Sequence, residues 1–471
     1  MKQSANCYPC LTFLLFGLAV ILRLLLCSQN PPTNSFDDHY EPVSLIMKTG
    51  EIPRKDACFE CYNPPVFYSI AAVTANALRS LGLSVDTVQK ALQFQNCFYN
   101  ILTLLIVYMI LKKFSNLTEF SRLFAFGTVC FLPRHIYMAA MFSNDNLGYL
   151  GVAVCTYLML VTLERREPWW LFAVLLGMAA SLTVFVKYTG FVVLPMIAIA
   201  YLTLAARKAE ERRSRPFAMM FIALLPPLFL LGSYMVTNYK DYGDLLPWNE
   251  KFLDTSKIQP RDDEQLNFFS FTPWQYIREP VQVPGQLHSF WTLIYTNAWF
   301  DTEPKFLHYT DWDKGWWSQY WTWRRGESTF PAAQIPLSTL TRTFAVGLLT
   351  FGLIPLFLLL AGMIGSIHKF STGTDNCVTI EKCLPLLILL AGNAALVIWL
   401  TLKAPVFSSM KASYLLGSLP AFGVFIAQGA QLFEGRCWWR YIISFALIML
   451  VLFTSLHVMR IAWSIKSWSY L

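Results

Sequence analysis

Long apolar segments separated by short polar ones run through most of the chain. The clear apolar segments are 11–26, 91–111, 120–142, 147–163, 169–186, 190–206, 217–236, 340–367, 384–402, 414–433 and 438–458. A helix needs about 20 mostly apolar residues to cross a bilayer, and these segments approach or reach that length. The pattern predicts an all-α polytopic membrane protein with about eleven transmembrane helices.

Segment 64–83 is the one ambiguous apolar stretch, because Asn76, Arg79 and Ser80 interrupt it. If it does not cross, the short basic loops, such as the one with Lys112 and Lys113 and the one at 207–215, all fall on one side. This is the distribution that the positive-inside rule requires of cytoplasmic loops. We therefore expect 64–83 to be a juxtamembrane helix in the first outer loop, with the N-terminus inside and the C-terminus outside.

Composition supports this class of protein. Hydrophobic residues make up 55% of the chain and charged residues only 14%, and the mean hydropathy is +0.44. The net charge of +8 is explained by the basic loops, so we expect no nucleic-acid partner. We expect three parts: an N-terminal transmembrane module at 1–236 that includes the first outer loop at 28–90, a long outer loop at 237–338, and C-terminal transmembrane helices at 339–471.

Unusual polar residues gather in the segments expected outside. Asp37, Asp38, His39 and Glu41 follow the first apolar segment directly. A carboxylate in hydrocarbon is costly, so this cluster must lie where water or a ligand solvates it. Other charges at the expected outer corners are Asp145, Lys187, Lys403 and Lys411. Any one of them taken alone is equally well explained as an ordinary loop charge.

The long outer loop is rich in tryptophan. It holds nine of the sixteen Trp residues, and five of these fall within 312–323. An aromatic belt at the headgroup level explains some of them. Tryptophan faces also stack on sugar rings and attract cations, so a loop that docks a glycan or a lipid headgroup is the alternative.

Several short motifs in one order resemble the GT-C superfamily of membrane glycosyltransferases. They are the acidic pair Asp37 and Asp38, the run 63–68 (NPPVFY), Asn144 with Asp145, the run 187–190 (KYTG), and Asn238, Tyr242, Gly243 and Asp244. Within the superfamily, the chain is most similar to the group with aminoarabinose lipid A transferases and relatives of protein O-mannosyltransferases. The resemblance covers roughly residues 10–250, with weaker agreement near 411–420.

The resemblance implies transfer of a sugar from a polyprenyl-phosphate donor to a glycan, lipid or protein acceptor. An acceptor hydroxyl becomes more acidic as it attacks, so a carboxylate can take its proton, and Asp38 or Asp37 is the implied base. The departing lipid phosphate needs its charge stabilised, and Lys187, Arg134, Lys403 and Lys411 are the candidates for that. The substrate-binding candidates are His39, Tyr40, Glu41, Tyr68, Asn144, Asp145, Tyr188, Tyr242, Trp316 and Trp317. We expect the active site on the periplasmic face of a bacterial inner membrane, in contact with membrane lipids.

The acids and cysteines of the outer loops raise the questions of a metal site and a disulfide. Asp37, Asp38 and Asp145 could present oxygen ligands to Mg²⁺ or Mn²⁺, but the sequence lacks the paired acids of metal-dependent oligosaccharyltransferases at its second outer loop, so we expect no required metal. Cys58 and Cys61 could form a disulfide, join His39 at a metal, or stay as thiols, and we favour the disulfide.

A transporter or flippase for a lipid or glycolipid is the rival class of function. Such a protein would bury ionisable residues at mid-span or contain two homologous halves with broken helices. Lys187 and Arg134 are the cations expected near the interior of a span, and both are expected near its outer end. No internal repeat is evident, so the sequence favours the glycosyltransferase.

Overall fold

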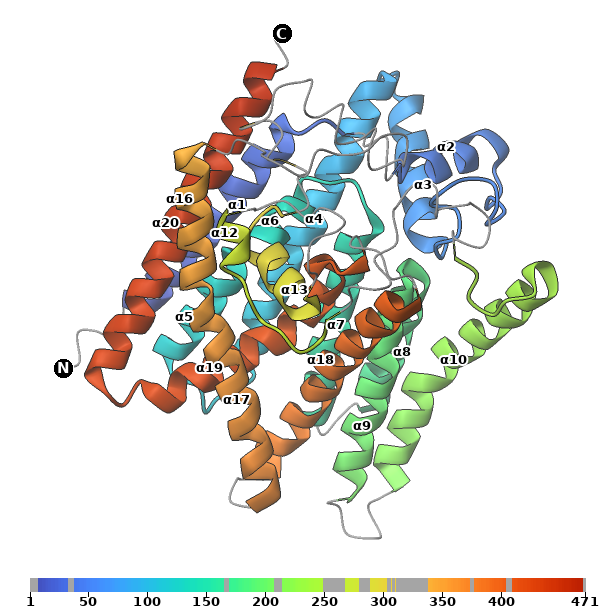
Figure 1. Cartoon of the computed structure of the whole chain (residues 1–471). Helices are drawn as coiled ribbons and strands as arrows, with labels where there is room; N and C mark the ends of the chain where they lie inside the picture. The colour runs from blue at the N-terminus through green and yellow to red at the C-terminus, as the bar shows by residue number, and fades with distance from the viewer. Residues whose placement is uncertain are drawn as a thin grey trace.

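A computed structural model describes residues 7–32, 38–164, 169–206, 214–248, 267–278, 289–302, 306, 310, 338–372, 377–403 and 409–468. The regular secondary structure of these residues is helical, apart from a single isolated bridge between Asn267 and Ser289. The helices are α1 (Cys7–Gln29), α2 (Tyr40–Thr49), α3 (Val66–Ser80), α4 (Val85–Lys112), α5 (Glu119–Cys130), α6 (Pro133–Ala139), α7 (Asn144–Glu164), α8 (Trp169–Val186), α9 (Val193–Ala206), α10 (Ser214–Tyr242), α12 (Gln275–Arg278), α13 (Phe290–Trp299), α16 (Thr339–Phe351), α17 (Leu353–Thr372), α18 (Cys377–Lys403), α19 (Leu419–Phe433) and α20 (Cys437–Trp468). Two 3-10 helices, η2 (Tyr188–Val192) and η7 (Ala412–Ser418), complete them (Figure 1).

Ten helical stretches in the described residues are long and apolar enough to cross a membrane, which confirms the polytopic all-α prediction. The segment 120–142, expected as an eleventh continuous helix, is instead divided into α5 and α6. Pro133 is the cause, because it lacks a backbone N–H and restricts the residue before it, and Leu132 is accordingly extended, with ψ 111°. Proline at the first position then starts α6.

Such a break exposes backbone carbonyls, which inside a membrane must find donors from the protein. The Arg23 guanidinium on α1 donates to the Cys130 carbonyl at 3.0 Å, and the Thr454 hydroxyl on α20 donates to the Phe131 carbonyl at 3.1 Å. Arg23 is fully buried. The expectation that Lys187 and Arg134 would be the cations near a span interior was therefore wrong, since it overlooked Arg23 inside the first apolar segment.

An amide stripe on α4 holds the chain that follows the break. Gln93, Asn96 and Asn100 recur at helical spacing and face the same neighbour. Their side-chain amides donate to the carbonyls of Ala140 at 2.7 Å, Ser143 at 2.6 Å and His135 at 3.0 Å, respectively. These bonds fix α6 and the loop up to the start of α7.

The basic loops meet at one end of the bundle. Glu164, at the end of α7, accepts from Lys113 at 2.8 Å and from Lys382 at 2.5 Å. The Thr118 hydroxyl donates to Glu434 at 2.6 Å, which joins α5 to the end of α19. The segment 112–118, the end of α7, the start of α18 and the end of α19 therefore meet at one end of the bundle, where the positive-inside argument places the basic loops.

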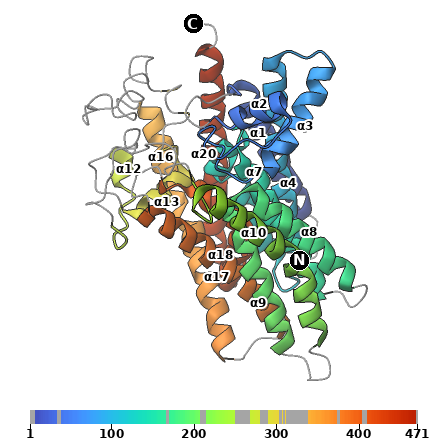
Figure 2. The same ribbon diagram turned by 90° about the vertical axis from the view of Figure 1, so that its right-hand side faces the viewer.

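The first outer loop folds into α2 and α3 at the opposite end, beside α4 and α8 (Figures 1 and 2). Both are too short to be among the ten spanning candidates, which agrees with the expectation that 64–83 does not cross the membrane. A small apolar core that includes Val43, Phe67, Val88 and Val186 packs the loop against α4 and α8.

Lys55 ties the same loop to η2 and α10. Its ammonium donates to the Tyr62 carbonyl at 2.9 Å and the Tyr234 hydroxyl at 2.5 Å, and it lies 3.5 Å from the Tyr188 hydroxyl. Its backbone N–H donates to the Tyr242 hydroxyl at 3.2 Å. Burial disfavours the charged form and lowers the pKa of Lys55 to about 8.

Helices α17 and α19 approach at backbone contact through glycines. A Cβ at Gly362 would lie 1.9 Å from the Phe425 carbonyl oxygen, and one at Gly429 would lie 1.9 Å from the Leu358 carbonyl oxygen. Close approach through small residues is a common way for helices to pack in membranes.

We predict that Gly362→Ala and Gly429→Ala each destabilise the protein by about 1–3 kcal/mol or more, because the added methyl group must push α17 and α19 apart. The measurement is the thermal unfolding midpoint of purified protein in nanodiscs. Gly232→Ala is the control, since a Cβ there meets open space. Unchanged midpoints for both core variants would show that the helices do not pack in this way.

We predict that stability rises with pH between about 8 and 10.5, because the unfolded chain keeps the Lys55 proton over this range while the folded protein releases it. The contribution of Lys55 is at most about 3 kcal/mol. Unfolding midpoints of wild type and Lys55→Met across this range measure it, and the difference between the two proteins should change with pH. Parallel curves would contradict the assignment.

Candidate functional site

The centre of the site is an ion pair between the buried Asp145 and the partly buried Lys187. The Lys187 ammonium lies 2.6 Å from one carboxylate oxygen, and the Ser143 hydroxyl donates to the other at 2.9 Å. Asp145 lies in the first turn of α7, where the helix dipole favours a negative charge. Lys187 follows α8 directly and precedes η2. A buried ion pair adds little stability on balance, so its presence suggests a role other than holding the fold.

A tyrosine one turn further along α7 and the segment at η7 border this pair. The Tyr149 hydroxyl lies 3.2 Å from Asp145 and 2.7 Å from the Ser413 carbonyl oxygen. The Lys187 ammonium lies 5.3 Å from the centre of the Tyr414 ring. Ser413 and Tyr414 at the start of η7 therefore adjoin the pair, and Lys411 precedes them in the chain.

The tip 143–146 is fixed from both sides. The Asn144 amide donates to the Val186 carbonyl at 3.4 Å, and Asn146 donates to the Met138 carbonyl at 2.7 Å. Arg134 is buried on α6, within electrostatic reach of Tyr149. The structure therefore brings Asn144, Asp145, Lys187 and Arg134 to one region.

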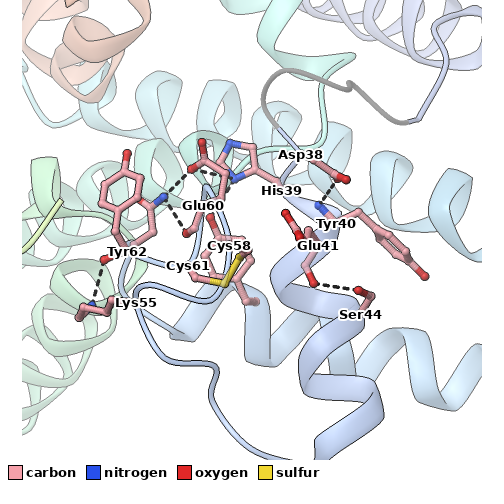
Figure 3. Close-up of a disulfide and its surroundings, with 12 residues drawn as sticks. Asp38, His39, Tyr40, Glu41, Ser44, Lys55, Cys58, Glu60, Cys61 and Tyr62 are labelled. Carbon is pink, nitrogen blue, oxygen red and sulfur yellow. Dashed lines mark hydrogen bonds and ion pairs between the residues drawn. A yellow bond between two sulfur atoms is a disulfide. The ribbon is translucent and has the colours of Figure 1, made fainter. Parts of the chain in front are cut away.

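Asp38 lies two residues before the first residue of α2. Its carboxylate accepts the Tyr40 backbone N–H at 2.9 Å, so one of its oxygens is held at the start of that helix. His39 beside it is buried, and its Nδ1 atom lies 2.8 Å from the Tyr68 hydroxyl. The same atom lies 3.8 Å from the Glu60 carboxylate (Figure 3). Burial raises the pKa of the Tyr40 phenol.

Cys58 and Cys61 form the disulfide that the sequence favoured (Figure 3). Glu60 lies between them and is buried, with one carboxylate oxygen accepting from the Asn63 amide at 2.6 Å. Glu60 was not among the sequence-based candidates. Its position inside the Cys-x-x-Cys segment was the one signal, and that signal says nothing about burial.

The first loop and the tip belong to one cluster. The rings of Phe67 and Phe142 pack with centres 5.2 Å apart, which places α3 against the residue before Ser143. His39 and Lys187 both lie within electrostatic reach of Asp145. Residues far apart in sequence, from the first loop to η7, thus converge at the end of the bundle opposite the basic loops.

Other candidates lie elsewhere or cannot be placed. Lys403 stacks on Trp248 and Trp399, with its ammonium 4.6 Å and 5.2 Å from the ring centres, and no described contact joins it to Asp145. Tyr188 and Tyr242 contact Lys55, and Glu41 is exposed on α2. Asp37, Trp316 and Trp317 lie outside the described residues.

Within the described ranges, no group of three or more His, Cys, Asp or Glu side chains is arranged to hold a metal ion. Asp38 and Asp145 are therefore not part of such a group. The disulfide also removes Cys58 and Cys61 from the pool of thiol ligands.

The fold resembles that of solved GT-C enzymes. The oligosaccharyltransferase of Archaeoglobus fulgidus in its apo form superimposes with a TM-score of 0.52 at 11% identity, over 95% of this chain and 56% of that one. The same organism's AglB, solved with an inhibitory peptide and a dolichol-phosphate, gives 0.51 at 12% identity, over 97% and 56%. The chain thus spans little more than half of the archaeal enzyme. The predicted GT-C-like fold is confirmed.

ArnT of Cupriavidus metallidurans bound to undecaprenyl phosphate matches more weakly, with a TM-score of 0.36 at 13% identity, over 88% of this chain and 76% of that one. The specific resemblance to aminoarabinose transferases therefore stays a prediction.

Sequence comparison places the chain in a family. No curated protein matches it. The family model described as "Predicted membrane protein (DUF2142)" matches residues 34–312, which include the first loop, the tip 143–146 and the corner at Lys187. Since the match covers more than half of the chain, the protein belongs to this DUF2142 family of membrane proteins.

Proposed function

We propose that this protein is a membrane glycosyltransferase that moves a sugar from a polyprenyl-phosphate donor to an acceptor on the outer side of the membrane. The observation that carries the proposal is the Asp145–Lys187 pair, set beside the acidic first loop at the end of the bundle opposite the basic loops. The GT-C-like fold supports it, since AglB of this fold was solved with a dolichol-phosphate.

Asp38 is the proposed base, with Asp37 beside it in the chain. A carboxylate near the acceptor hydroxyl takes its proton as the new glycosidic bond forms. The bond from the anomeric carbon to the phosphate oxygen breaks, and the electron pair leaves with the lipid phosphate. One oxygen of Asp38 holds the start of α2, so the second oxygen is the one to accept the proton.

Lys187 is the proposed main contact to the departing phosphate, with Arg134 and Lys411 as further contacts. An ammonium has three donors, so Lys187 can keep Asp145 and bind a phosphate oxygen together. Asp145 orients Lys187 and prevents an excess of positive charge when no anion is bound. Lys403 with Trp248 and Trp399 is better suited to the lipid headgroup region.

The substrates follow from this chemistry by class. The donor is a sugar on a polyprenyl phosphate, and the acceptor is a hydroxyl of a glycan, lipid or protein. We propose a bacterial inner membrane, with the cluster on the periplasmic side, because the basic loops lie at the opposite end. No metal is assigned a role.

The buried Arg23 bears on the transporter alternative, which expects ionisable residues within spans. The partners of Arg23 are the carbonyls of Ala19 and Cys130, the Asn100 amide oxygen and the His135 ring. These contacts satisfy a helix break, so Arg23 has a structural explanation and does not require transport.

We predict that Asp38→Asn and Lys187→Gln lower sugar transfer by about 10²-fold or more while the proteins insert normally, because each loses a charge that the transition state needs. The assay uses purified protein in vesicles with a polyprenyl-phosphate sugar and detects product by mass spectrometry. Asp86→Asn, an exposed acid at the start of α4, is the control and should keep full activity. Wild-type protein that flips the donor across vesicles without any glycosylated product would favour the transporter.

A further inference from the structure

Two buried cysteines have no role in the proposed reaction. Cys27 lies in the last turn of α1 and Cys97 lies on α4, and the exposed fraction of each is 0%. Neither belongs to the disulfide of the first outer loop. A buried cysteine usually acts as a small apolar side chain. Two cysteines that face each other can instead form a bond, so the contacts around them decide between these roles.

Hydrogen bonds on both sides of Cys27 fix the register of α1 against α4. Toward the interior of the bundle, the Arg23 Nε atom donates to the Asn100 side-chain oxygen at 2.7 Å. Toward the first loop, the Lys90 ammonium donates to the Cys27 carbonyl at 2.6 Å and to the Asn30 carbonyl at 2.7 Å. The two helices are therefore antiparallel neighbours that are held together at two levels (Figure 1).

This register brings the two cysteines together. Residues 23 and 27 are one turn apart on α1, and residues 97 and 100 are one turn apart on α4, so each pair shares one face of its helix. Since Arg23 is held at Asn100, one turn toward the first loop sets Cys27 against Cys97. The two thiols are hydrogen-bonded to each other, as this register requires.

Other buried cysteines have partners of a different kind. The Cys155 sulfur lies 3.5 Å from the Thr183 hydroxyl. The Gln428 amide lies 3.1 Å from the Cys383 sulfur. These are contacts of a buried thiol with a polar side chain. The pair on α1 and α4 differs because each thiol has the other as a hydrogen-bond partner, and contact between two sulfurs is the first requirement of a disulfide.

The pair lies at the end of the bundle where a disulfide already exists. The first outer loop joins α1 to α4 and contains the disulfide described above. Cys27 comes just before that loop. Gln93, one turn before Cys97 on α4, still donates to the Asn30 carbonyl at the start of the loop, at 3.2 Å. Both thiols are therefore close to a compartment in which a disulfide of the same loop persists.

We propose that Cys27 and Cys97 are a second disulfide site, which links α1 to α4 at the base of the first outer loop. The partner is a thiol oxidant, a protein that carries an exchangeable disulfide, in the compartment that contains the loop. One thiolate of the pair attacks this disulfide and forms a mixed disulfide, and the second thiolate then attacks the mixed disulfide. The pair loses two protons and two electrons, and the disulfide of the oxidant is reduced to two thiols.

Burial determines when the bond forms. Both sulfurs are inaccessible in the packed bundle, so the exchange takes place before α1 has packed against α4. After packing, the same burial protects the bond from reductants. The bond closes a segment of chain that contains α2 and α3, so it restricts the unfolded chain far more than the short bridge between Cys58 and Cys61 does. The site is a covalent lock that is set during assembly.

The experiment maps the disulfides of the full-length protein, made in cells with an active thiol oxidase in the compartment that contains the loop and purified without reductant. Free thiols are blocked with N-ethylmaleimide during denaturation, and the unreduced digest is analysed by mass spectrometry. We expect most molecules to give a peptide pair that joins Cys27 to Cys97. Cys155→Ser, which changes another buried thiol, is the control and should give the same pair. Blocked thiols at both positions in most molecules, or linkage of either cysteine to a different one, would overturn the proposal.

The unfolding midpoint gives a second readout, which two neighbouring thiols without a bond would not change. Protein made in cells without the thiol oxidase should unfold several degrees lower than the oxidised protein, because it lacks both disulfides. The Cys27→Ala, Cys97→Ala double variant should show a smaller difference between the two sources, because it can lose only the short bridge. Equal differences for wild type and the variant would contradict the lock. If the variant does not fold, the peptide map of wild type decides by itself.

Discussion

The need to satisfy backbone carbonyls inside the membrane determines the arrangement on which the rest of the structure depends. Pro133 breaks what would be one transmembrane helix, and the carbonyls of Cys130 and Phe131 are satisfied by Arg23 and Thr454. The amide stripe on α4 then holds the chain from α6 to Ser143. Because these bonds fix the end of the broken helix, they also fix where α7 begins, and Asp145 lies in its first turn.

The first loop is docked by contacts of its own. It has an apolar core against α4 and α8, and Lys55 ties it to η2 and α10. The Asp145–Lys187 pair and the Glu60–His39 contact come in addition, and both lie at the end of the bundle away from the basic loops. This separation of docking contacts from buried charge is why we interpret the charges as a ligand site.

Much of the fold was predictable from the sequence because hydrophobic length directly reflects the thickness of a membrane. The basic loops predicted that 64–83 does not cross the membrane, and α3 is too short to be a spanning candidate. The Cys58–Cys61 disulfide was favoured among three alternatives and is present. The division of 120–142 was missed, because the segment stays apolar through Pro133 and hydropathy does not report a break. Arg23 was missed for the same reason, since one cation inside a long apolar run hardly changes its average.

The site was less predictable than the fold, because its members are far apart in the sequence. Motif order identified Asp145 and Lys187 as candidates, and the structure places their charged groups 2.6 Å apart. Lys403 lies at the end of a long helix and has the same charge as Lys187, yet it stacks on Trp248 and Trp399. Tertiary packing determines which partner each lysine has, and the sequence does not show it. In the sequence, Glu60 cannot be distinguished from an ordinary acid in a loop. In the structure it is buried between the two disulfide cysteines and contacts Asn63 and His39.

The most direct test of the account is photo-crosslinking with a polyprenyl phosphate that carries a photoreactive group next to the phosphate, followed by mass spectrometric mapping of the labelled peptide. The account predicts labels in the first loop near His39, at the tip near Asp145, at the corner near Lys187 or in segment 411–414, and competition by unlabelled polyprenyl phosphate. Labels confined to the basic end near Lys113 and Lys382, or labels that do not compete, would contradict the claim that this end of the bundle binds a lipid phosphate.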